Sequence, residues 1–269
     1  MLNDIKDYWN NQPCNINHSK KEFGTLDYFN EVEEKKYFVE PHIKSFANFE
    51  QWKDKKVLEL GCGIGTDSIN FARAGAILTV VDLSSKSIDI CKKRFEVFNL
   101  QARFINGDIE TIDSLLENEK FDLIYSFGVI HHTITPKNVI NAVYKLMNPD
   151  SEFRFMVYSK ISYKLFWLMI ENNKNNINDG LNLLKSNSEA QSNCPMTHLY
   201  NFDEIRNDLL DDRFNILNIW KDHIFIYDIP NYKNNIYIKD KYWQNMNNNE
   251  IKHFENDLGW HTMVIAKIK

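Results

Sequence analysis

Short β-branched apolar runs alternate with amphipathic stretches between residues 56 and 158, and this rhythm constrains the fold more than any other feature of the chain. Five apolar runs predict strands, at 57–60, 77–81, 102–105, 121–127 and 153–158. Three stretches between them have helical spacing of their apolar residues, at 66–74, 85–98 and 137–147. Because successive parallel strands need crossover connections, the alternation predicts βαβ units and a parallel sheet.

Segments outside this core break the rhythm. Residues 25–39 carry apolar side chains at roughly helical spacing, and Pro41 is expected to end that helix. An Asn-rich stretch at 171–193 is interpreted as an insertion packed over the carboxyl edge of the sheet. The fold is expected to be completed by a helix at 202–210 and by strands at 214–220 and 260–268.

The length and composition favour one α/β domain with insertions. With 269 residues, of which 43% are hydrophobic, the chain can bury a sizeable core. The expected parts are an N-terminal helical cap at 1–52, a Rossmann-like core at 53–158, a lid or acceptor insertion at 159–200, and a C-terminal part of the core at 201–269 that contains a second insertion at 221–258.

Charge, cysteines and apolar segments exclude several classes of protein. The net charge is -5 and no Lys/Arg stripe is interleaved with aromatic residues, so nucleic acid is a poor expected partner. The longest apolar stretch, at 161–170, is too short to span a bilayer and no signal peptide is apparent, which predicts a cytoplasmic protein. Four cysteines without Cys-x-x-Cys spacing are expected to be reduced thiols, with no metal site: Cys14, Cys62, Cys91 and Cys194.

A glycine-rich turn follows the first expected strand and precedes a helix. It contains Gly61, Cys62, Gly63 and Gly65. Glycine suits such a turn because it tolerates positive φ and lets a ligand approach the backbone closely. A dinucleotide fingerprint, Gly-x-Gly-x-x-Gly, would place glycine or alanine at the position that Thr66 occupies, which argues against an NAD-dependent dehydrogenase.

With Glu59 in front of it, this turn reads Glu-x-Gly-x-Gly-x-Gly and resembles motif I of class I S-adenosylmethionine-dependent methyltransferases. The resemblance covers roughly residues 56–158. It implies a doubly wound, seven-stranded mixed sheet of order 3-2-1-4-5-7-6, in which the last strand is antiparallel. It also implies S-adenosyl-L-methionine as methyl donor and S-adenosyl-L-homocysteine as product.

Two further segments carry the same resemblance. Asp82 and Leu83 close the second strand, where an acidic residue of the family hydrogen-bonds both ribose hydroxyls. Asp108 and Ile109 follow the third strand, where the family's Asp accepts from the adenine amino group and the next residue packs on the ring. A helix cap or turn is the alternative role for either carboxylate.

Aromatic side chains are expected around the positively charged sulfur of the donor, since aromatic faces attract cations. The fourth strand ends at Phe127, in a position that resembles the family strand ending against the methionine moiety. Tyr8, Trp9 and Tyr37 precede the sheet and are further candidates, with Tyr8 and Trp9 in a segment similar to the helix that closes over the donor in relatives. Simple packing is the alternative for each ring.

His131 and His132 follow the fourth strand, at the edge where ligands of open α/β sheets bind. The near-neutral pKa of histidine suits removal of a proton from a hydroxyl acceptor, so one of the two is the expected general base. The alternative is that both only shape the pocket.

The acceptor is expected to be a small molecule that contacts Tyr158, His198 and Tyr200. The apolar stretch at 161–170 is interpreted as a lid over the site, with a subunit contact in a homodimer as the alternative. Two other functions stay open: a non-catalytic protein that binds S-adenosylmethionine or S-adenosylhomocysteine, and a methyltransferase acting on RNA or protein, which the net negative charge disfavours.

Overall fold

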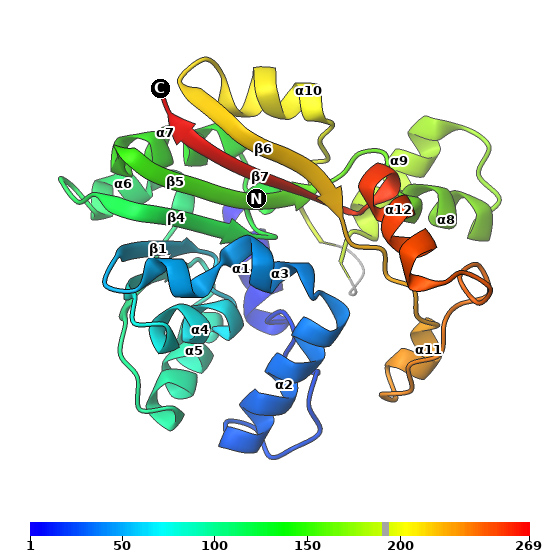
Figure 1. Ribbon diagram of the computed structural model, residues 1–269, viewed down its shortest axis with the longest axis horizontal. Coiled ribbons are helices and arrows are strands. Elements are labelled where there is room, and N and C mark those ends of the chain that lie inside the picture. Colours follow the sequence, from blue (N-terminus) through cyan, green and yellow to red (C-terminus); the bar gives the residue numbers. More distant parts are fainter. Residues whose placement is uncertain (190–193) are drawn as a thin grey trace.

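A seven-stranded mixed sheet forms the centre of the computed structural model, which describes residues 1–189 and 194–269 (Figure 1). The strands are β1 (Lys56–Leu60), β2 (Ile77–Asp82), β3 (Arg103–Asn106), β4 (Phe121–Phe127), β5 (Met147–Tyr158), β6 (Phe214–Asp222) and β7 (His261–Ile268). They lie in the order β3-β2-β1-β4-β5-β7-β6, in which β7 is antiparallel to both of its neighbours. The strand order and mixed sheet predicted from the sequence are confirmed.

Helices flank both faces of the sheet and its carboxyl edge (Figure 1). The α-helices are α1 (Leu2–Asn11), α2 (Leu26–Val39), α3 (His42–Ala47), α4 (Thr66–Arg73), α5 (Ser85–Val97), α6 (Ile112–Leu115), α7 (Pro136–Leu146), α8 (Tyr163–Glu171), α9 (Ile177–Ser186), α10 (Phe202–Glu204), α11 (Ile229–Tyr232) and α12 (Asn248–Leu258). Short 3-10 helices are η1 (Phe49–Trp52), η2 (Ile109–Thr111) and η3 (Ile130–His132), and η4 (Ile205–Leu210) is a π-helix.

Alternation along the strands divides the core into two layers. Phe153, Phe155 and Val157 of β5 pack on one face together with α6, α7 and η4. Met156 and Tyr158 of the same strand point to the other face, which α3, α4 and α5 cover. Successive side chains of a strand point to opposite faces, so the continuous apolar runs of the sequence serve both layers.

Two segments differ most from the sequence expectations. β5 begins at Met147 rather than at 153, and a register irregularity in its pairing with β4 accommodates the extra residues. Met147 therefore starts a strand instead of ending α7. The helix expected at 202–210 starts as α10 with an Asn201 capping box and continues as the π-helix η4.

The arrows of β4 and β6 point to the side of Figure 1 where α8, α9, α11 and α12 gather. These helices belong to the two stretches that the sequence marks as insertions, at 159–200 and 221–258; of the Asn-rich stretch, residues 190–193 lie outside the described residues. Among the helices that the structure describes, none combines the length and apolar character needed to cross a membrane.

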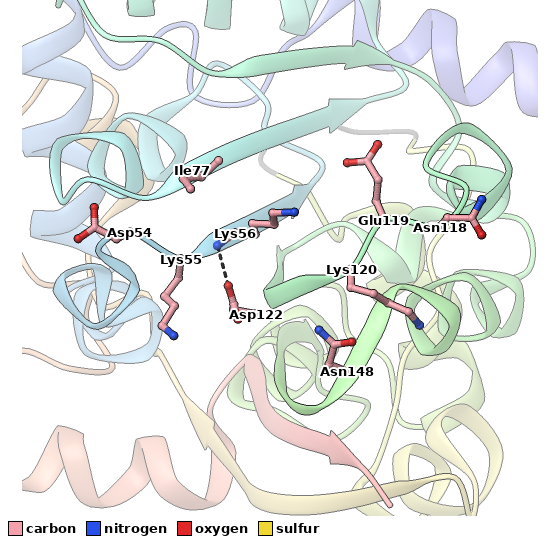
Figure 2. Close-up of a pocket in the computed structure, with 9 residues that line it drawn as sticks. All are labelled: Asp54, Lys55, Lys56, Ile77, Asn118, Glu119, Lys120, Asp122 and Asn148. Carbon is pink, nitrogen blue, oxygen red and sulfur yellow. Dashed lines mark hydrogen bonds between the residues drawn. The ribbon is translucent and has the colours of Figure 1, made fainter.

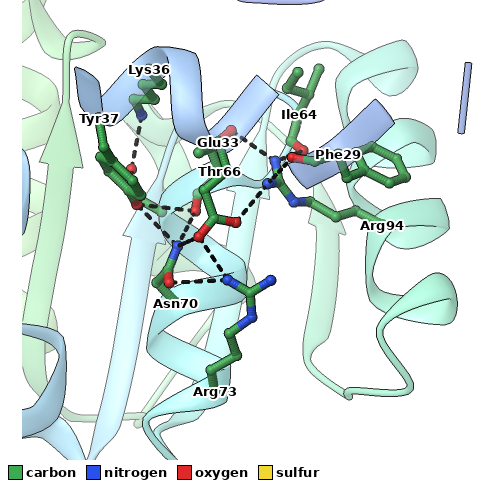
Figure 3. Close-up of polar contacts among 10 residues, drawn as sticks. Phe29, Glu33, Lys36, Tyr37, Ile64, Thr66, Asn70, Arg73 and Arg94 are labelled. Carbon is green, nitrogen blue, oxygen red and sulfur yellow. Dashed lines mark hydrogen bonds and ion pairs between the residues drawn. The ribbon is translucent and has the colours of Figure 1, made fainter. Parts of the chain in front are cut away.

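A buried charged network fastens α2 to the glycine turn (Figure 3). The guanidinium group of Arg94 on α5 is fully buried and donates to the Phe29 carbonyl at 3.1 Å, to Oγ1 of Thr66 at 2.8 Å and to Oε2 of Glu33 at 3.0 Å. Arg73 of α4 donates to the other Glu33 oxygen at 2.7 Å. The Glu33 carboxylate of α2 is thus bound by arginine side chains of both α4 and α5, beside the start of α4.

Candidate functional site

A cavity of about 1020 Å³ opens over the carboxyl ends of the strands. Its wall includes the last residues of β1, β2, β4 and β5 and the loops that follow them. Parallel α/β sheets bind ligands at this edge, because the loops there can vary without disturbing the sheet. The cavity is therefore the candidate site.

A second pocket lies at the opposite edge of the sheet (Figure 2). It has a volume of about 510 Å³ and lies beside Lys56 and Ile77, the first residues of β1 and β2. The backbone N–H of Lys56 donates to Oδ2 of Asp122 at 2.8 Å, so this carboxylate already has a partner. The pocket contains none of the residues that the sequence singled out.

The three glycines of the turn have different surroundings. All have positive φ, between 51° and 80°. A Cβ atom on Gly61 would lie 2.3 Å from a methyl carbon of Val129, and one on Gly65 would lie 2.6 Å from Sγ of Cys91. A Cβ atom on Gly63 would meet no atom within 4 Å, because this residue faces the cavity. Gly61, Cys62 and Gly63 line the cavity, whereas Gly65 allows α4 to approach α5.

Asp82 and Leu83 line the cavity at the end of β2. Oδ2 of Asp82 accepts the backbone N–H of Gly63 at 2.9 Å, and Oδ1 accepts that of Ser84 at 2.8 Å. Burial raises the pKa of this carboxyl group to about 6, against the effect of both hydrogen bonds. The carboxylate thus orients the glycine turn and still faces the cavity.

Asp108 and Ile109 line the adjacent part of the cavity after β3. Oδ1 of Asp108 accepts the backbone N–H of Glu110 at 2.9 Å and caps η2, while burial raises the pKa of its carboxyl group. Ile109 is only 5% exposed. A carboxylate beside an apolar surface suits a flat heterocycle that carries an amino group.

Glu59 lies deeper, near the end of β1, and also lines the cavity. Its carboxylate accepts the hydroxyl group of Ser68, and burial together with the charge of Asp67 raises its pKa to about 8. A cationic group beside Glu59 would favour the ionised form. Phe127, at the end of β4, lines the cavity as well.

A lysine and an aspartate between α2 and α4 form part of the same wall, although the sequence assigned them no role. Nζ of Lys36 lies 2.8 Å from Oδ1 of Asp67, and both residues line the cavity. The hydroxyl groups of Tyr37 and Tyr125 each donate to Asp67 at 3.0 Å. Tyr37 does not line the cavity, so the structure gives it contact with Asp67 and Thr66.

The N-terminal helix α1 brings one of its two aromatic residues to the cavity. Trp9 lines it, and its ring centroid is 5.3 Å from that of His132. Tyr8 packs edge-on against Trp9 at 5.0 Å between ring centroids and is not part of the cavity wall.

The two adjacent histidines have unlike positions. His132 lines the cavity; its Nδ1 donates to the Met196 carbonyl at 2.8 Å, and its Nε2 lies 3.0 Å from Oε1 of Glu189. His131 is fully buried behind it, with its ring centroid 3.9 Å from that of Tyr158. Among the described residues its two ring nitrogens have no hydrogen-bond partner, and burial holds its pKa well below the ordinary value.

Of the three residues that the sequence predicts to contact the methyl acceptor, one lines the cavity and two do not. Tyr158 lines the cavity, and its hydroxyl group donates to Oε1 of Glu189 at 2.7 Å. His198 and Tyr200 are not part of the cavity wall. Nε2 of His198 lies 3.1 Å from the Thr133 carbonyl, and its backbone N–H donates to the His131 carbonyl at 2.8 Å. His198 thus supports the loop that carries His132, whereas the backbone N–H of Tyr200 donates to the Tyr158 carbonyl at 3.0 Å.

Aromatic side chains from both insertions line the remaining part of the cavity. The sequence marked only 161–170 as a lid; the other contributors lie in the second insertion or, for Trp260, just before β7, where no motif indicated them. The aromatic wall, as we call it, consists of Tyr163, Trp167, Phe225, Tyr227, Trp243 and Trp260. Its segments follow β5 and β6 or precede β7, whereas Asp82 and Asp108 follow β2 and β3 on the other side of β1 and β4.

Comparisons with known proteins indicate the family to which this chain belongs. A family model described as a methyltransferase domain matches residues 52–249. Ubiquinone biosynthesis O-methyltransferase of Actinobacillus pleuropneumoniae serotype 5b is 31% identical over 122 residues, which cover 43% of this chain and 50% of that protein. The enzyme of the same name from Coxiella burnetii is 32% identical over 108 residues, which cover 40% and 45%. The chain thus spans about half the length of these curated relatives.

Solved structures share the whole fold. Magnesium protoporphyrin IX methyltransferase from Synechocystis PCC 6803, solved with bound SAH, superimposes with a TM-score of 0.62 over 100% of both chains at 15% identity. A S-adenosylmethionine-dependent methyltransferase from Clostridium acetobutylicum has a TM-score of 0.53 over 98% of both chains at 14% identity. At these identities the likeness shows the fold alone. Because the family model covers well over half of the chain, this protein belongs to the methyltransferase domain family.

Proposed function

We propose that this chain is an S-adenosylmethionine-dependent methyltransferase whose acceptor is a small molecule with an aromatic or apolar body. The observation that carries the proposal is the composition of the large cavity. One set of lining residues comprises the glycine turn, Asp82 and Asp108, as the sequence predicts for the donor, and the other is the aromatic wall. Phe127 and His132, at and after the end of the central strand β4, line the same cavity.

The residues present suit the donor. Gly63 presents open backbone to the cavity, where a side chain would occupy ligand space. Asp82 is suited to accept from ribose hydroxyls and Asp108 from an adenine amino group, with Ile109 against the ring. Glu59 supplies a buried carboxyl group whose ionised form an amino acid ammonium group would favour. S-adenosylmethionine, when bound, supplies a methyl group already activated on a positively charged sulfur.

The protein's further tasks are to orient the acceptor and to accept a proton where the acceptor carries one. His132 is the predicted general base that reaches the cavity, and it lies beside Glu189. Burial alone would lower the pKa of His132, but hydrogen bonds to Cys194 and Glu189 raise it to about 10. In the free protein His132 therefore holds a proton at neutral pH, and Glu189 is the member of the pair that can accept one.

A non-catalytic binding protein is the alternative. Such a protein can seal the space beside the donor, whereas a transferase must admit an acceptor. The continuity of the cavity from Asp82 to the aromatic wall favours the transferase. A preference for small molecules over nucleic acid rests on the net charge of -5, and a cytoplasmic location and a homodimer stay predictions from the sequence.

Calorimetric titration with S-adenosylhomocysteine tests the donor site, with NADH as the negative ligand. Asp82→Ala should weaken binding by about 10- to 150-fold, because hydrogen bonds to a charged group contribute about 1.5–3 kcal/mol. Asp89→Ala, on the exposed side of α5, is the matched control and should bind as the wild type does. Absence of saturable binding by the wild type, or binding of NADH instead, would refute the proposal.

Turnover is tested separately by release of S-adenosylhomocysteine from S-adenosylmethionine in the presence of a panel of phenols, catechols and aromatic amines. Trp167→Ala and Trp243→Ala should raise KM for an active acceptor while leaving the affinity for S-adenosylhomocysteine unchanged. Donor binding without turnover on any acceptor would favour the non-catalytic alternative.

A further inference from the structure

A cluster of imidazole and carboxylate groups lies beside the aromatic wall and has no role in the function proposed above. It consists of Glu40, which follows α2, His223, which follows β6, and His261, the first residue of β7. All three line the cavity. Each residue offers one ligand atom, and these atoms lie within 4.8 Å of one another.

Two members of the cluster lack the partners that buried polar groups normally have. Neither ring nitrogen of His223 makes a hydrogen bond to a described residue, although the side chain is 7% exposed. The carboxylate of Glu40 likewise makes no hydrogen bond within the described part of the chain, and its nearest cationic or imidazole contact is Nε2 of His261 at 3.7 Å. Since buried polar groups are nearly always hydrogen-bonded or ligated, the ring nitrogens of His223 are positioned for a ligand. The Glu40 carboxylate is 21% exposed and lines the cavity beside them.

The ring of His261, the third member of the cluster, is oriented by a chain of polar contacts that begins at its other ring nitrogen. Nδ1 of His261 lies 3.0 Å from Nε2 of His42, whose Nδ1 lies 3.9 Å from Oδ1 of Asp222. His261 thereby keeps Nε2 for the cavity. A histidine that binds a metal through one nitrogen normally has its other nitrogen held by a second group in this way.

The backbone around His223 is also fixed. Its φ is 67°, in the left-handed region, and its N–H donates to Oδ1 of Asp222 at 2.8 Å. Its carbonyl accepts the N–H of Trp260 at 2.9 Å. The ring centroids of His223 and His261 lie 4.5 Å apart. A non-glycine residue held in this conformation is uncommon and often lies at a functional site.

We propose that Glu40, His223 and His261 bind a divalent transition-metal ion whose open coordination positions face the acceptor part of the cavity. Two imidazoles and one carboxylate form the donor set of many catalytic zinc and non-haem iron sites. Two donor atoms that each lie about 2.1 Å from an ion at a tetrahedral angle are about 3.4 Å apart, so the widest pair must approach by up to about 1.4 Å. Rotations of the Glu40 and His223 side chains would have to supply that shift.

The open positions would bind an oxygen or nitrogen atom of the acceptor and so orient it against the aromatic wall. This acceptor role rests on the proposed function, whereas metal binding itself does not. A metal-bound hydroxyl group also loses its proton more readily than a free one, so the site favours acceptors that carry a hydroxyl group.

Calorimetry with zinc sulfate tests the site, using full-length chain that carries no affinity tag and has been treated with a chelator. We expect about one equivalent of zinc to bind. Glu40→Gln and His261→Ala should each abolish this binding, and His42→Ala should weaken it by about 10- to 100-fold, as expected for a group that holds a ligand in place. His253→Ala, at an exposed position of α12, is the control and should leave binding unchanged.

Two further measurements test whether the bound ion has open coordination positions and whether this cluster binds it. Cobalt(II) should give visible absorption bands that change when sodium azide occupies open positions; unchanged bands would refute the open site. Glu189→Gln tests the other group of possible ligands, His131, His132 and Glu189. Zinc binding that is lost in Glu189→Gln but kept in Glu40→Gln, or no binding at all, would overturn the proposal.

S-adenosylhomocysteine titration of every variant separates the two proposals. Retained binding shows that a variant is folded, so a loss of zinc binding is then local. A wild-type chain that binds zinc but not S-adenosylhomocysteine would refute the proposed function and leave the metal site in place. A wild-type chain that binds S-adenosylhomocysteine but not zinc would refute the metal site alone.

Discussion

Nε2 of His132 lies 3.0 Å from Oε1 of Glu189, and the two side chains are only 4% and 13% exposed. Burial alone would lower the pKa of His132, but its hydrogen bonds to Cys194 and Glu189 raise that pKa to about 10. Burial alone would raise the pKa of Glu189, but the contact with His132 holds it below its ordinary value. The pair is therefore an imidazolium and a carboxylate at neutral pH.

Glu189→Gln should destabilise the protein by about 3 kcal/mol near pH 6, because it removes one partner of a buried ion pair. The stabilisation from His132 is complete below its ordinary pKa of 6.5 and is lost as the pH rises through about 10. The stabilisation from Glu189 is complete above 4.5 and is lost as the pH falls through its lowered pKa. The difference in unfolding free energy between wild type and variant should therefore be largest between about pH 4.5 and 6.5 and shrink towards pH 10.

Urea denaturation at several pH values measures this difference. Glu117→Gln replaces an exposed carboxylate and should change the free energy of unfolding little at any pH. A Glu189→Gln difference that stays constant from pH 6 to pH 10 would contradict the ion pair.

Gly63→Ala and Gly65→Ala should fail in different ways, although the two residues are neighbours in one turn. Gly65 has a φ of 76°, and a Cβ atom on it would lie 2.6 Å from Sγ of Cys91. Alanine at this position should therefore lower the free energy of unfolding by about 1–3 kcal/mol or more. Gly63 has a φ of 51° and space around it, so alanine should cost less stability but occupy the cavity. Thermal denaturation and S-adenosylhomocysteine titration separate the two effects. Equal loss of affinity at equal stability in both variants would argue against the distinction.

Arg94→Met should destabilise the protein by about 3–5 kcal/mol, because the substitution removes one of the two arginine partners of Glu33 and leaves the Phe29 carbonyl and the Thr66 hydroxyl group without this donor. Arg206→Met, which removes an exposed pair with Asp203, should cost less than about 1 kcal/mol. Denaturant unfolding of the wild type and both variants is the measurement, and an Arg94→Met cost as small as that of Arg206→Met would exclude a stabilising role for the network.

The strands and the glycine-turn half of the cavity could be predicted because they depend on short-range patterns, whereas the order of the strands was implied by the family resemblance. A strand, a turn and a helix adjacent in sequence determine where Gly63 and Asp82 lie, and the parallel order brings Asp108 to the same edge. The extra residues of β5 could not be predicted, since Asn148, Pro149 and Asp150 have the composition of a turn.

The other half of the cavity depends on contacts between distant segments. Glu40, His223 and His261 come from three elements that no local spacing relates, and Glu189 lies in an Asn-rich stretch without a motif. Adjacent residues also point in different directions on the 3-10 helix η3, so a pattern that marks His131 and His132 together cannot tell which of them reaches the cavity.

Binding of S-adenosylhomocysteine should weaken as the pH falls below about 6. Burial raises the pKa of Asp82 from 3.8 to about 6, and only the ionised carboxylate can accept hydrogen bonds through both oxygen atoms. If the ligand binds the ionised form, complex formation at about pH 5.5 must release protons, which calorimetry detects as a dependence of the binding enthalpy on the buffer. Asp82→Asn should bind more weakly at neutral pH and lose this pH dependence. A wild-type affinity that is constant from about pH 5 to pH 8 would mean that Asp82 does not contact the ligand, and the donor would then have to be held by other residues of the cavity.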